Sequence, residues 1–382
     1  MDPGPAKLEI REARSAADRR AFLDLGYRLN ERDPNWIAPL RGELKALIDP
    51  RKNPWFEHGR LVLFLAARGG RVTGRISAQI DELVLSHMGA GLGQWGLFDA
   101  EDEESARALL GAAETWLKDQ GMVRSMGPFS LGIWDEPGLL IEGQDHPPMV
   151  MMGHHPAAYR GWIERAGYQK AKDLYTFDTP VDRPFPPIVQ RIIAAGEKNP
   201  RIVVRRVDKK RFDEEAELIL SILNQAWSGN WGFIPLTDSE IAYASRKLKP
   251  IVLEELIRVA EYDGEPVAFM MGLPDINEFL ADLGGSLLPF GWAKLLWRLK
   301  RMRPQGGRVP LMGVIPRLHA TRLASQLAFM MIESIRRAGH EQHGIVRAEI
   351  GWILEDNGPM LSIGEAIGAH RNRTYRIYEK PL

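Results

Sequence analysis

The sequence VPLMGVIPRLHATRLASQLAFMMIESIRRAG, residues 309–339, changes its periodicity once. It begins as a buried apolar strand that ends at Pro316, continues through a short polar turn, and becomes a helix near Thr321 or Arg322. The first N–H groups of a helix have no partner within the helix, and the helix dipole puts partial positive charge at that end. We therefore expect this turn to suit phosphate groups.

Side chains around the turn favour the same ligand chemistry. Arg317 and Arg322 add positive charge, and small residues such as Ala324 let a ligand approach the backbone. The preceding strand can offer N–H groups to a thioester carbonyl, as acyl transfer from a pyrophosphate-bearing carrier requires. The other interpretation that these residues allow is an ordinary turn between a strand and a helix, with solvated arginines.

Around this stretch, the same order of elements occurs twice, which indicates a duplication. The sequences Glu164-Arg165-Ala166-Gly167 and Glu365-Ala366-Ile367-Gly368 occupy the same place in the two halves. In the first half we expect strands at 8–13, 61–67, 71–81, 94–98 and 173–177, with a tight turn at 68–70, and helices at 16–31, 103–120 and 157–166. In the second half we expect strands at 201–207, 256–262, 265–275, 309–315, 346–354 and 374–378, with a tight turn at 263–264, and helices at 212–227, 322–339 and 360–367.

Composition limits the class of protein. The chain has 382 residues, a formal net charge of zero, no cysteine, 45% hydrophobic and 26% charged residues. Its length favours two domains, and the balanced charge argues against bulk nucleic-acid binding. Disulfides and thiolate chemistry are excluded. We expect no signal peptide at the charged N-terminus and no membrane-spanning helix, hence a cytoplasmic protein, in solution or on the inner face of the cytoplasmic membrane.

These observations together predict an α/β protein of two similar domains, each a central mixed sheet flanked by helices. We place an N-terminal domain at 1–178, a Pro-rich linker at 179–200 and a C-terminal domain at 201–382. The first domain contains an irregular loop at 123–159, and the second an insertion at 284–304.

The order of elements resembles that of the GNAT superfamily of acyl-CoA-dependent N-acyltransferases. Its Arg/Gln-x-x-Gly-x-Gly/Ala motif falls on His319-Ala320-Thr321-Arg322-Leu323-Ala324, where His319 and Arg322 depart from the pattern. The strand, asparagine and helix that follow in the family match Glu349–Asn357 (EIGWILEDN). The resemblance implies acyl-CoA as co-substrate, with no metal. The residues we expect to bind it are Gly313, Val314, Ile315, Arg317, Thr321, Arg322, Ala324 and Asn357.

A GNAT-type reaction needs a base for the attacking amine and donors for the oxyanion, and many members also supply an acid for the leaving thiolate. The family's acid position, near Ile363, holds no tyrosine, so Tyr378 or Tyr375 is the candidate, or no acid is used. Each candidate carboxylate named in the next sentence also suits a surface or capping role. The candidate catalytic residues are Glu349, Asp275, Glu240 and Tyr378.

Two irregular stretches are candidates for the walls of an acceptor pocket. The run at 227–235 (WSGNWGFIP) is aromatic in a Gly/Asn/Pro context, and the loop at 129–159 concentrates histidine, carboxylate, Met and Pro residues. Long loops of this kind are usually functional. A plug over the core and an N-cap role for His154 are the structural alternatives. The candidate substrate-binding residues are Trp231, Phe233, Asn277, Trp134, Glu136, His154 and Tyr159; no ligand spacing typical of a metal site occurs.

The insertion contains LLPFGWAKLLWRLKRMR at 287–303. As a helix it places Trp292, Leu296 and Leu299 on one stripe and Lys294 and Arg301 on another. That pattern is typical of a helix that lies in a membrane interface. A helix packed on the core, with its long cationic side chains reaching water, is the alternative.

Within the superfamily, the chain resembles the bacterial tandem GNAT-like group that includes the ceramide synthases. The resemblance lies in Asn230–Pro235 (NWGFIP), Pro274–Asn277 (PDIN) and Glu349–Asn357. It implies N-acylation of a long-chain, sphingoid-type amine at a membrane surface. Two alternatives stay open: a GNAT-fold acyltransferase acting on a soluble amine or aminoacyl acceptor, and an inactive GNAT-fold binding protein.

Overall fold

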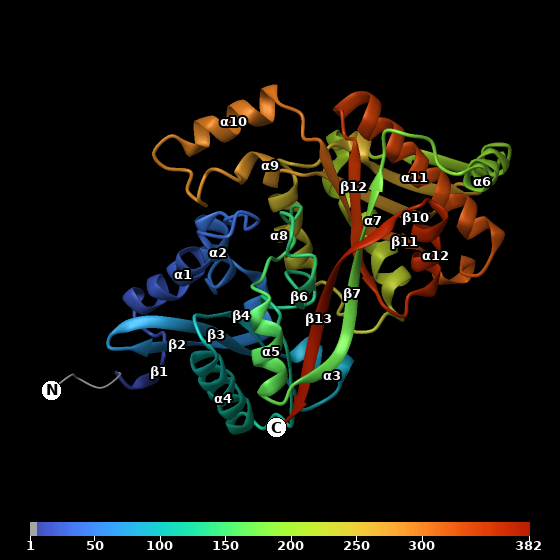
Figure 1. The fold of residues 1–382 in the computed structure, drawn as a ribbon. Helices are drawn as coiled ribbons and strands as arrows, with labels where there is room; N and C mark the ends of the chain where they lie inside the picture. The colour runs from blue at the N-terminus through green and yellow to red at the C-terminus, as the bar shows by residue number, and fades with distance from the viewer. Residues whose placement is uncertain (1–5) are drawn as a thin grey trace. The chain divides into compact units, whose positions relative to one another are not determined.

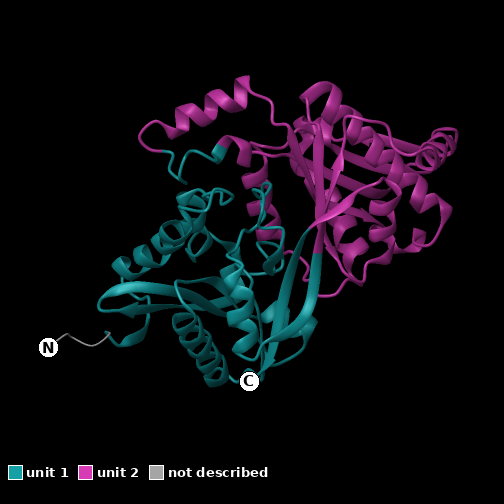
Figure 2. Cartoon of the chain, viewed as in Figure 1, with its two compact units in different colours: residues 1–174, 280–287, 373–382 teal, residues 175–279, 288–372 magenta. Residues whose placement is uncertain are grey.

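The computed structural model describes residues 6–382 (Figure 1). Two compact units make up the chain (Figure 2). Unit 1 comprises the chain up to Leu174 together with Leu280–Leu287 and Arg373–Leu382, and unit 2 comprises Tyr175–Phe279 and Leu288–Asn372. Each unit contains a mixed sheet with helices packed on it, which confirms the expected α/β class.

The two units exchange strands. The strand β7 (Gln169–Pro180) begins in unit 1 and ends in unit 2, whereas β13 (His370–Pro381) begins in unit 2 and ends in unit 1. The C-terminal part of the chain therefore completes the sheet of the N-terminal unit. The predicted domains, 1–178 and 201–382, are consecutive segments and so do not include this exchange. The predicted linker, 179–200, contains helix α6 (Pro187–Glu197), which packs on α11 (Arg322–His343).

Unit 1 is built on a sheet in which β4 and β5 are parallel and the other pairs are antiparallel. Its strands, in order across the sheet, are β1 (Leu8–Glu12), β2 (Gly59–Arg68), β3 (Arg71–Asp81), β4 (Leu92–Ala100), β5 (Arg124–Gly127) and the end of β13, on which β6 (Leu139–Glu142) also pairs. Its helices are α1 (Ala16–Asn30), α2 (Arg41–Leu47), α3 (Glu82–Met88), α4 (Glu103–Asp119) and α5 (Ala158–Arg165).

Unit 2 repeats this arrangement, with one parallel pair, β11 and β12, in a sheet that is otherwise antiparallel where its register is defined. Its strands follow the order β12 (Arg347–Leu354), β11 (Gly306–Val314), β10 (Glu265–Pro274), β9 (Ile257–Tyr262) and β8 (Ile202–Arg206). Besides α6 and α11, its helices are α7 (Phe212–Trp227), α8 (Asp238–Leu248), α9 (Asn277–Leu280), α10 (Gly291–Arg301) and α12 (Gly358–Ala366).

The hairpin at the centre of each unit follows from its turn residues. Gly69 and Gly70 connect β2 to β3 with φ of 58° and 80°, and Asp263 and Gly264 connect β9 to β10 with φ of 55° and 79°. Two-residue turns with positive φ match the right-handed twist of antiparallel strands, and Gly, Asn and Asp tolerate that conformation best. Both predicted turns are confirmed.

Strand β3 shows how the sheet of unit 1 is stabilised on both faces. Ile76, Ala78 and Ile80 are at most 1% exposed and join the core beneath α4. Successive side chains of a strand point to opposite faces, and the alternate residues from Thr73 to Asp81 are polar and also buried. Among them, Arg75 pairs with Asp99 at 2.6 Å and donates to the backbone carbonyl of Phe22 on α1 at 2.9 Å.

Replacing Arg75 with Met should therefore destabilise the protein by about 3 kcal/mol, because Asp99 would stay buried without its partner. Denaturant unfolding measures the change. Arg71→Met is the matched control on the same strand: Arg71 is 64% exposed in its pair with Glu101, so its loss should cost less than about 1 kcal/mol. Equal losses in the two variants would contradict a special role for the buried pair.

Candidate active site

A β-bulge in β11 shapes the candidate site in unit 2. Met271 of β10 faces Leu311 and Leu273 faces Arg308, so Val309 and Pro310 together oppose Gly272. A bulge places two residues opposite one and bends the strand. Proline has no N–H to donate and is tolerated in sheets at such positions.

The bulge coincides with the end of pairing between β11 and β12. The parallel register runs from Gly306/Arg347 to Val309/Ile350, whereas β11 continues to Val314 and β12 to Leu354. The two strands therefore diverge beyond Val309, and we call the space between their diverging ends the β11/β12 notch. Ile315 N–H points toward β10, because it donates to the Val267 carbonyl at 2.9 Å. Backbone N–H groups alternate in direction along an antiparallel strand, so those of Met312 and Val314 point away from β10, toward the notch.

The turn after β11 leads directly to the N-terminus of α11. Pro316–Leu318 forms one turn of 3₁₀ helix, and Ala320 has a φ of 59°. Thr321 is the N-cap, and its hydroxyl accepts a hydrogen bond from Ala324 N–H at 3.2 Å. The N–H groups of Arg322 and Leu323 precede that bond in the first helical turn, where helices expose donors to anions.

Other predicted residues of this turn have structural partners. His319 Nε2 lies 2.7 Å from the Val314 carbonyl oxygen, and Arg317 pairs with Glu265. Ile315 is buried, and Gly313 packs so closely that an added Cβ would lie 2.8 Å from Ala226 of α7. Thus Gly313 and Val314 end β11, Ile315 leads into the 3₁₀ turn, and Arg322 is exposed at the start of α11.

Glu349 lies in the row of side chains next to the notch. It is 2% exposed and stands opposite Arg308, itself 1% exposed, in the register of β12 and β11. Asn372 donates to Glu349 Oε2 at 2.6 Å and accepts from the Thr176 hydroxyl at 2.7 Å. The Asn372 amide thus holds a buried carboxylate in place, and a carboxylate is a group that can act as a general base.

The face that Glu349 occupies is opposite to α11. Ala348 and Ile350, its neighbours on β12, line a cavity under α11 together with residues of that helix. Successive strand residues point to opposite faces, so Glu349 points away from α11. Arg308 donates to the Gly351 carbonyl at 3.1 Å, and its guanidinium lies 4.7 Å from the ring centre of Trp352, which fixes the strand beyond Glu349.

The other predicted acids of unit 2, and the predicted Asn357, lie at the starts of helices. Asp275 is 5% exposed, and its carboxylate accepts from Asn277 N–H at 3.2 Å at the start of α9. Glu240 forms a capping box with Thr237 at the start of α8. Asn357 is the N-cap of α12, with its side chain accepting from Met360 N–H at 3.2 Å. These contacts explain why each residue type stands where it does.

Tyr378 lies in unit 1, fully buried, where its hydroxyl donates to Glu164 at 3.1 Å. Burial and that carboxylate raise its pKa, which opposes proton donation to a leaving group. Tyr375 is also buried, and it donates to the Gly153 carbonyl at 2.9 Å. Neither tyrosine therefore enters our proposal as an acid.

The aromatic run after α7 is connected to β11. Trp227, the last residue of α7, donates from its indole N–H to the Met312 carbonyl at 2.9 Å. Trp231 and Phe233 follow and are partly exposed. The run thus begins beside the diverging part of β11, and the pocket-wall role predicted for Trp231 and Phe233 stays a prediction.

In unit 1 the chain itself closes the corresponding notch. Strands β4 and β5 pair only from Leu92/Arg124 to Gln94/Met126, and then Phe129 N–H donates to the Trp95 carbonyl at 2.9 Å. A Cβ on Gly96 would lie 1.4 Å from the Phe129 carbonyl oxygen, so the backbone of Phe129 lies directly against β4.

The helix that follows β4 begins with acidic residues. Asp102 caps α4 by accepting from Ser105 N–H at 2.8 Å, and Glu103 and Glu104 follow it in the first turn. Arg68 pairs with Asp102 and Glu104. Carboxylates already satisfy this helix N-terminus and would repel a pyrophosphate group. Of the two equivalent turns, only the one in unit 2 suits such an anion.

The predicted pocket residues of the 129–159 loop differ in their surroundings. Tyr159 is 1% exposed and its hydroxyl bonds to Asp99 and Ala100, so it belongs to the core. His154 Nε2 lies 3.0 Å from Asp33, and Ala157, not His154, is the N-cap residue of α5, which corrects the N-cap alternative. Trp134 is partly exposed and Glu136 exposed.

Burial lowers the pKa of His155 to about 4. Within residues 6–382, no group of three or more His, Cys, Asp or Glu side chains is placed to hold a metal ion. No helix in the described part of the chain has the length and apolarity needed to cross a bilayer.

Three residues of this site were not identified from the sequence. Pro310 carried a usable signal, because proline inside an apolar strand marks an edge or a bulge. Arg308 carried a signal as well, because it is the one charged residue in the otherwise apolar strand GGRVPLMGV. Asn372 had no local signal, since its role depends on β13 reaching Glu349 from elsewhere in the chain.

The chain is similar over its whole length to two named proteins. It is 42% identical over 384 aligned residues to the bacterial ceramide synthase of Caulobacter vibrioides (strain NA1000 / CB15N), with 100% of both chains covered. It is also 42% identical over 367 residues to Protein YghO of Escherichia coli (strain K12), covering 96% of this chain and 93% of that protein. No profile of a known protein family matches the chain.

Solved structures show the same fold. A tandem GNAT protein from the clavulanic acid biosynthesis pathway covers 98% of both chains with a TM-score of 0.56 and 13% identity. A GCN5-related N-acetyltransferase from Sphaerobacter thermophilus matches with a TM-score of 0.53 and 14% identity, over 98% of this chain and 95% of its own. The expected tandem GNAT-like fold is thereby confirmed.

The strained turn before α11 gives a direct test of the local geometry. Ala320→Gly should stabilise the protein by about 1 kcal/mol, because glycine adopts a left-handed conformation without the Cβ clash. Ala324→Gly, in the first turn of α11, should destabilise it by about 1 kcal/mol, because glycine is a poor helix former. Thermal unfolding measures both. Changes of the same sign at the two alanines would contradict this geometry.

Proposed function

The chain belongs to the same family of tandem GNAT-fold acyltransferases as the bacterial ceramide synthase of Caulobacter vibrioides, and we propose from that membership that it N-acylates a long-chain, sphingoid-type amine with acyl-CoA. The observation that carries the proposal is the β11/β12 notch, which opens toward the N-terminus of α11 in unit 2.

The proposed acyl-CoA site follows the direction of β11. The pyrophosphate lies at the N–H groups of Arg322 and Leu323, with the Arg322 guanidinium as counter-charge. The pantetheine arm lies in the notch, where it adds to the sheet edge through the N–H groups of β11. Asn357, the N-cap residue of α12 shortly after the end of β12, stays a candidate for the other side of this path.

We assign Glu349 as the base. The amine loses a proton to its carboxylate, the nitrogen attacks the thioester carbon, and the electron pair of the C=O bond moves onto oxygen. The N–H group of Met312 is our candidate donor to that oxyanion. Collapse of the intermediate breaks the C–S bond and releases the thiolate, which takes up the proton from Glu349 directly or through solvent. Asn372 is a positioning residue, because it holds the Glu349 carboxylate.

The reaction can be tested with purified protein, palmitoyl-CoA and a long-chain amino alcohol, with the amide product detected by mass spectrometry. Glu349→Gln should lower kcat about a hundredfold or more, because general-base catalysis is lost. Binding of palmitoyl-CoA by calorimetry should be unchanged. Glu341→Gln, an exposed residue of α11, is the matched control and should retain full activity.

Retained turnover in Glu349→Gln would refute the assignment of the base. Product formed only from soluble amines or aminoacyl acceptors would replace the lipid amine with those acceptors. Acyl-CoA binding without transfer to any amine would favour a GNAT-fold binding protein.

The second part of the proposal concerns α10, which presents an apolar surface to solvent. Its large side chains, with the flanking residues, are unusually exposed for their type: Leu288 78%, Phe290 77%, Trp292 54%, Leu296 46%, Trp297 58%, Leu299 42% and Met302 46%. Basic side chains Lys294, Lys300 and Arg301 stand between them. We propose that this helix lies in an anionic membrane interface, on the cytoplasmic face of the membrane.

Flotation with vesicles of phosphatidylglycerol and phosphatidylcholine tests this. The native protein should float, and the variant with Lys294, Lys300 and Arg301 changed to Glu should stay at the bottom of the gradient, because its helix is then repelled by the lipid. Arg298 is left unchanged since it donates to the Phe279 carbonyl at 2.6 Å. A control with Lys209, Lys210 and Arg211 changed to Glu alters the total charge equally and should float. Flotation of the α10 variant would remove the membrane proposal.

A further inference from the structure

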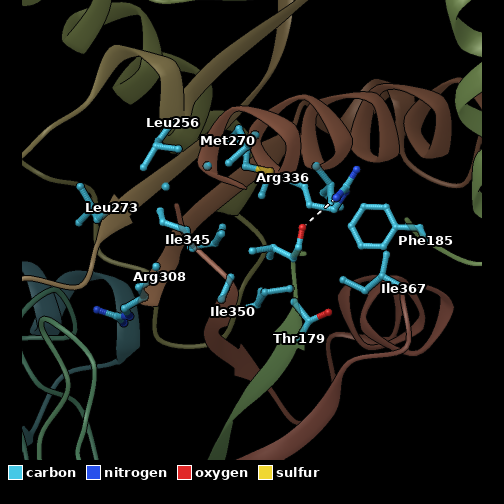
Figure 3. Close-up of a pocket in the computed structure, with 18 residues that line it drawn as sticks. Thr179, Phe185, Leu256, Met270, Leu273, Arg308, Arg336, Ile345, Ile350 and Ile367 are labelled. Atoms are coloured by element: carbon cyan, nitrogen blue, oxygen red, sulfur yellow. Dashed lines mark hydrogen bonds between the residues drawn. The ribbon is translucent and has the colours of Figure 1, made fainter. Parts of the chain in front are cut away.

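An apolar cavity of about 50 Å³ lies under α11 in unit 2 (Figure 3). Its floor is the face of the sheet that carries Gly272, Val309 and Ile350, and its roof is the face of α11 that carries Ile332, Ile335 and Gly339. Figure 3 shows Leu256, Met270, Ile345 and Ile367 among the side chains around it.

Carbon atoms form nearly the whole surface of this cavity. The arginines at its edge have other partners: Arg336 donates to the Val181 carbonyl at 2.8 Å, drawn as a dashed line in Figure 3, and Arg308 donates to Gly351. Apolar cavities exclude water and bind hydrocarbon. The chemistry of the lining therefore selects an aliphatic group.

Gly339 indicates that the space is not merely a packing fault. It lies inside α11, where alanine is the better helix former. A Cβ at this position would meet only Ile345 and Leu256 side chains, both at 3.6 Å, an ordinary contact distance. Alanine would thus improve the helix and reduce the void, and both changes would favour stability. The glycine keeps space that stability alone does not require.

The cavity lies at the closed end of the β11/β12 notch. Along β11 the order is cavity wall at Gly307–Val309, bulge at Pro310, diverging strand to Val314, and then the turn to α11. The proposed oxyanion donor, Met312 N–H, is four residues from position 308, which is about 13 Å of extended strand. An acyl chain whose thioester carbonyl lies at Met312 therefore needs about ten carbons to reach the cavity along the notch.

We propose that this cavity receives the far end of the acyl chain and so sets the preferred chain length. The inference rests on the proposed acyl-CoA site and adds the class of acyl group. Because the cavity is small, it takes the last few carbons of a chain whose nearer part lies in the notch.

The test compares binding of acetyl-, octanoyl- and palmitoyl-CoA by calorimetry. The native protein should bind palmitoyl-CoA most tightly, with about a fourfold gain for each methylene group that becomes buried. Ala348→Leu, which fills the cavity from β12, should lower the affinity for palmitoyl-CoA at least tenfold and leave that for acetyl-CoA unchanged. Ile335→Ala, which enlarges it, should shift the preference toward stearoyl-CoA, measured beside the other three thioesters.

Gly339→Ala provides a variant that the helix tolerates, and it should move the optimum in the direction of Ala348→Leu. Ala242→Leu, at an exposed position of α8, is the matched control and should bind every acyl-CoA as the native protein does. Opposite shifts in the filled and enlarged variants cannot come from a general loss of stability.

Equal affinity for the three thioesters in the native protein and in Ala348→Leu would overturn the inference and leave the proposed function standing. Absence of binding to coenzyme A and to every thioester would remove both.

Discussion

The bulge at Val309 and Pro310 is the constraint on which the candidate site depends. A proline at this position cannot extend the ladder, and the pairing of β11 with β12 ends one residue before it. From there the two strands diverge, which leaves N–H groups of β11 directed toward the notch and not toward a neighbouring strand. The turn after Val314 then brings the N-terminus of α11 to the open end of the same notch. A single local irregularity thus links a backbone edge, the N-terminus of a helix and the apolar cavity.

Two features of unit 1 distinguish the equivalent place there from the candidate site of unit 2. The same pairing ends early between β4 and β5, yet the backbone of Phe129 lies against Gly96, and Asp102 with its acidic neighbours occupies the N-terminus of α4. Each feature is incompatible with a pyrophosphate-bearing ligand for a separate physical reason, one steric and one electrostatic. The exchange of β7 and β13 means that neither unit contains all its strands in one continuous segment.

Local signals in the sequence were sufficient for most of the fold. Helix α7 begins and ends at the predicted residues, and the turns at Gly69-Gly70 and Asp263-Gly264 follow from residue types that tolerate positive φ. Helix α6 and the short strands β5 and β6 were missed, because proline and glycine around them suggested irregular chain. The strand exchange was also missed, since pairing between distant segments leaves no mark in periodicity.

Residues of the candidate site could be predicted only where a local pattern in the sequence marked them. The N-terminus of α11, with Thr321 and Arg322, came from a local pattern of strand, turn and helix. The network of Thr176, Asn372 and Glu349 joins three strands far apart in sequence, so no spacing could reveal it. Glu240 and Asp275 were candidates by residue type. Their hydrogen bonds put Glu240 in a capping box and Asp275 at the start of α9, and a catalytic role for either stays a prediction.

The number of coenzyme A molecules bound by each chain tests the central claim most directly. Calorimetry with the full chain should give one molecule of coenzyme A per chain, and Arg322→Glu should abolish that binding because it reverses the charge at the start of α11. Two molecules per chain, or undiminished binding in Arg322→Glu, would contradict an account in which the notch and turn of unit 2 alone hold the carrier.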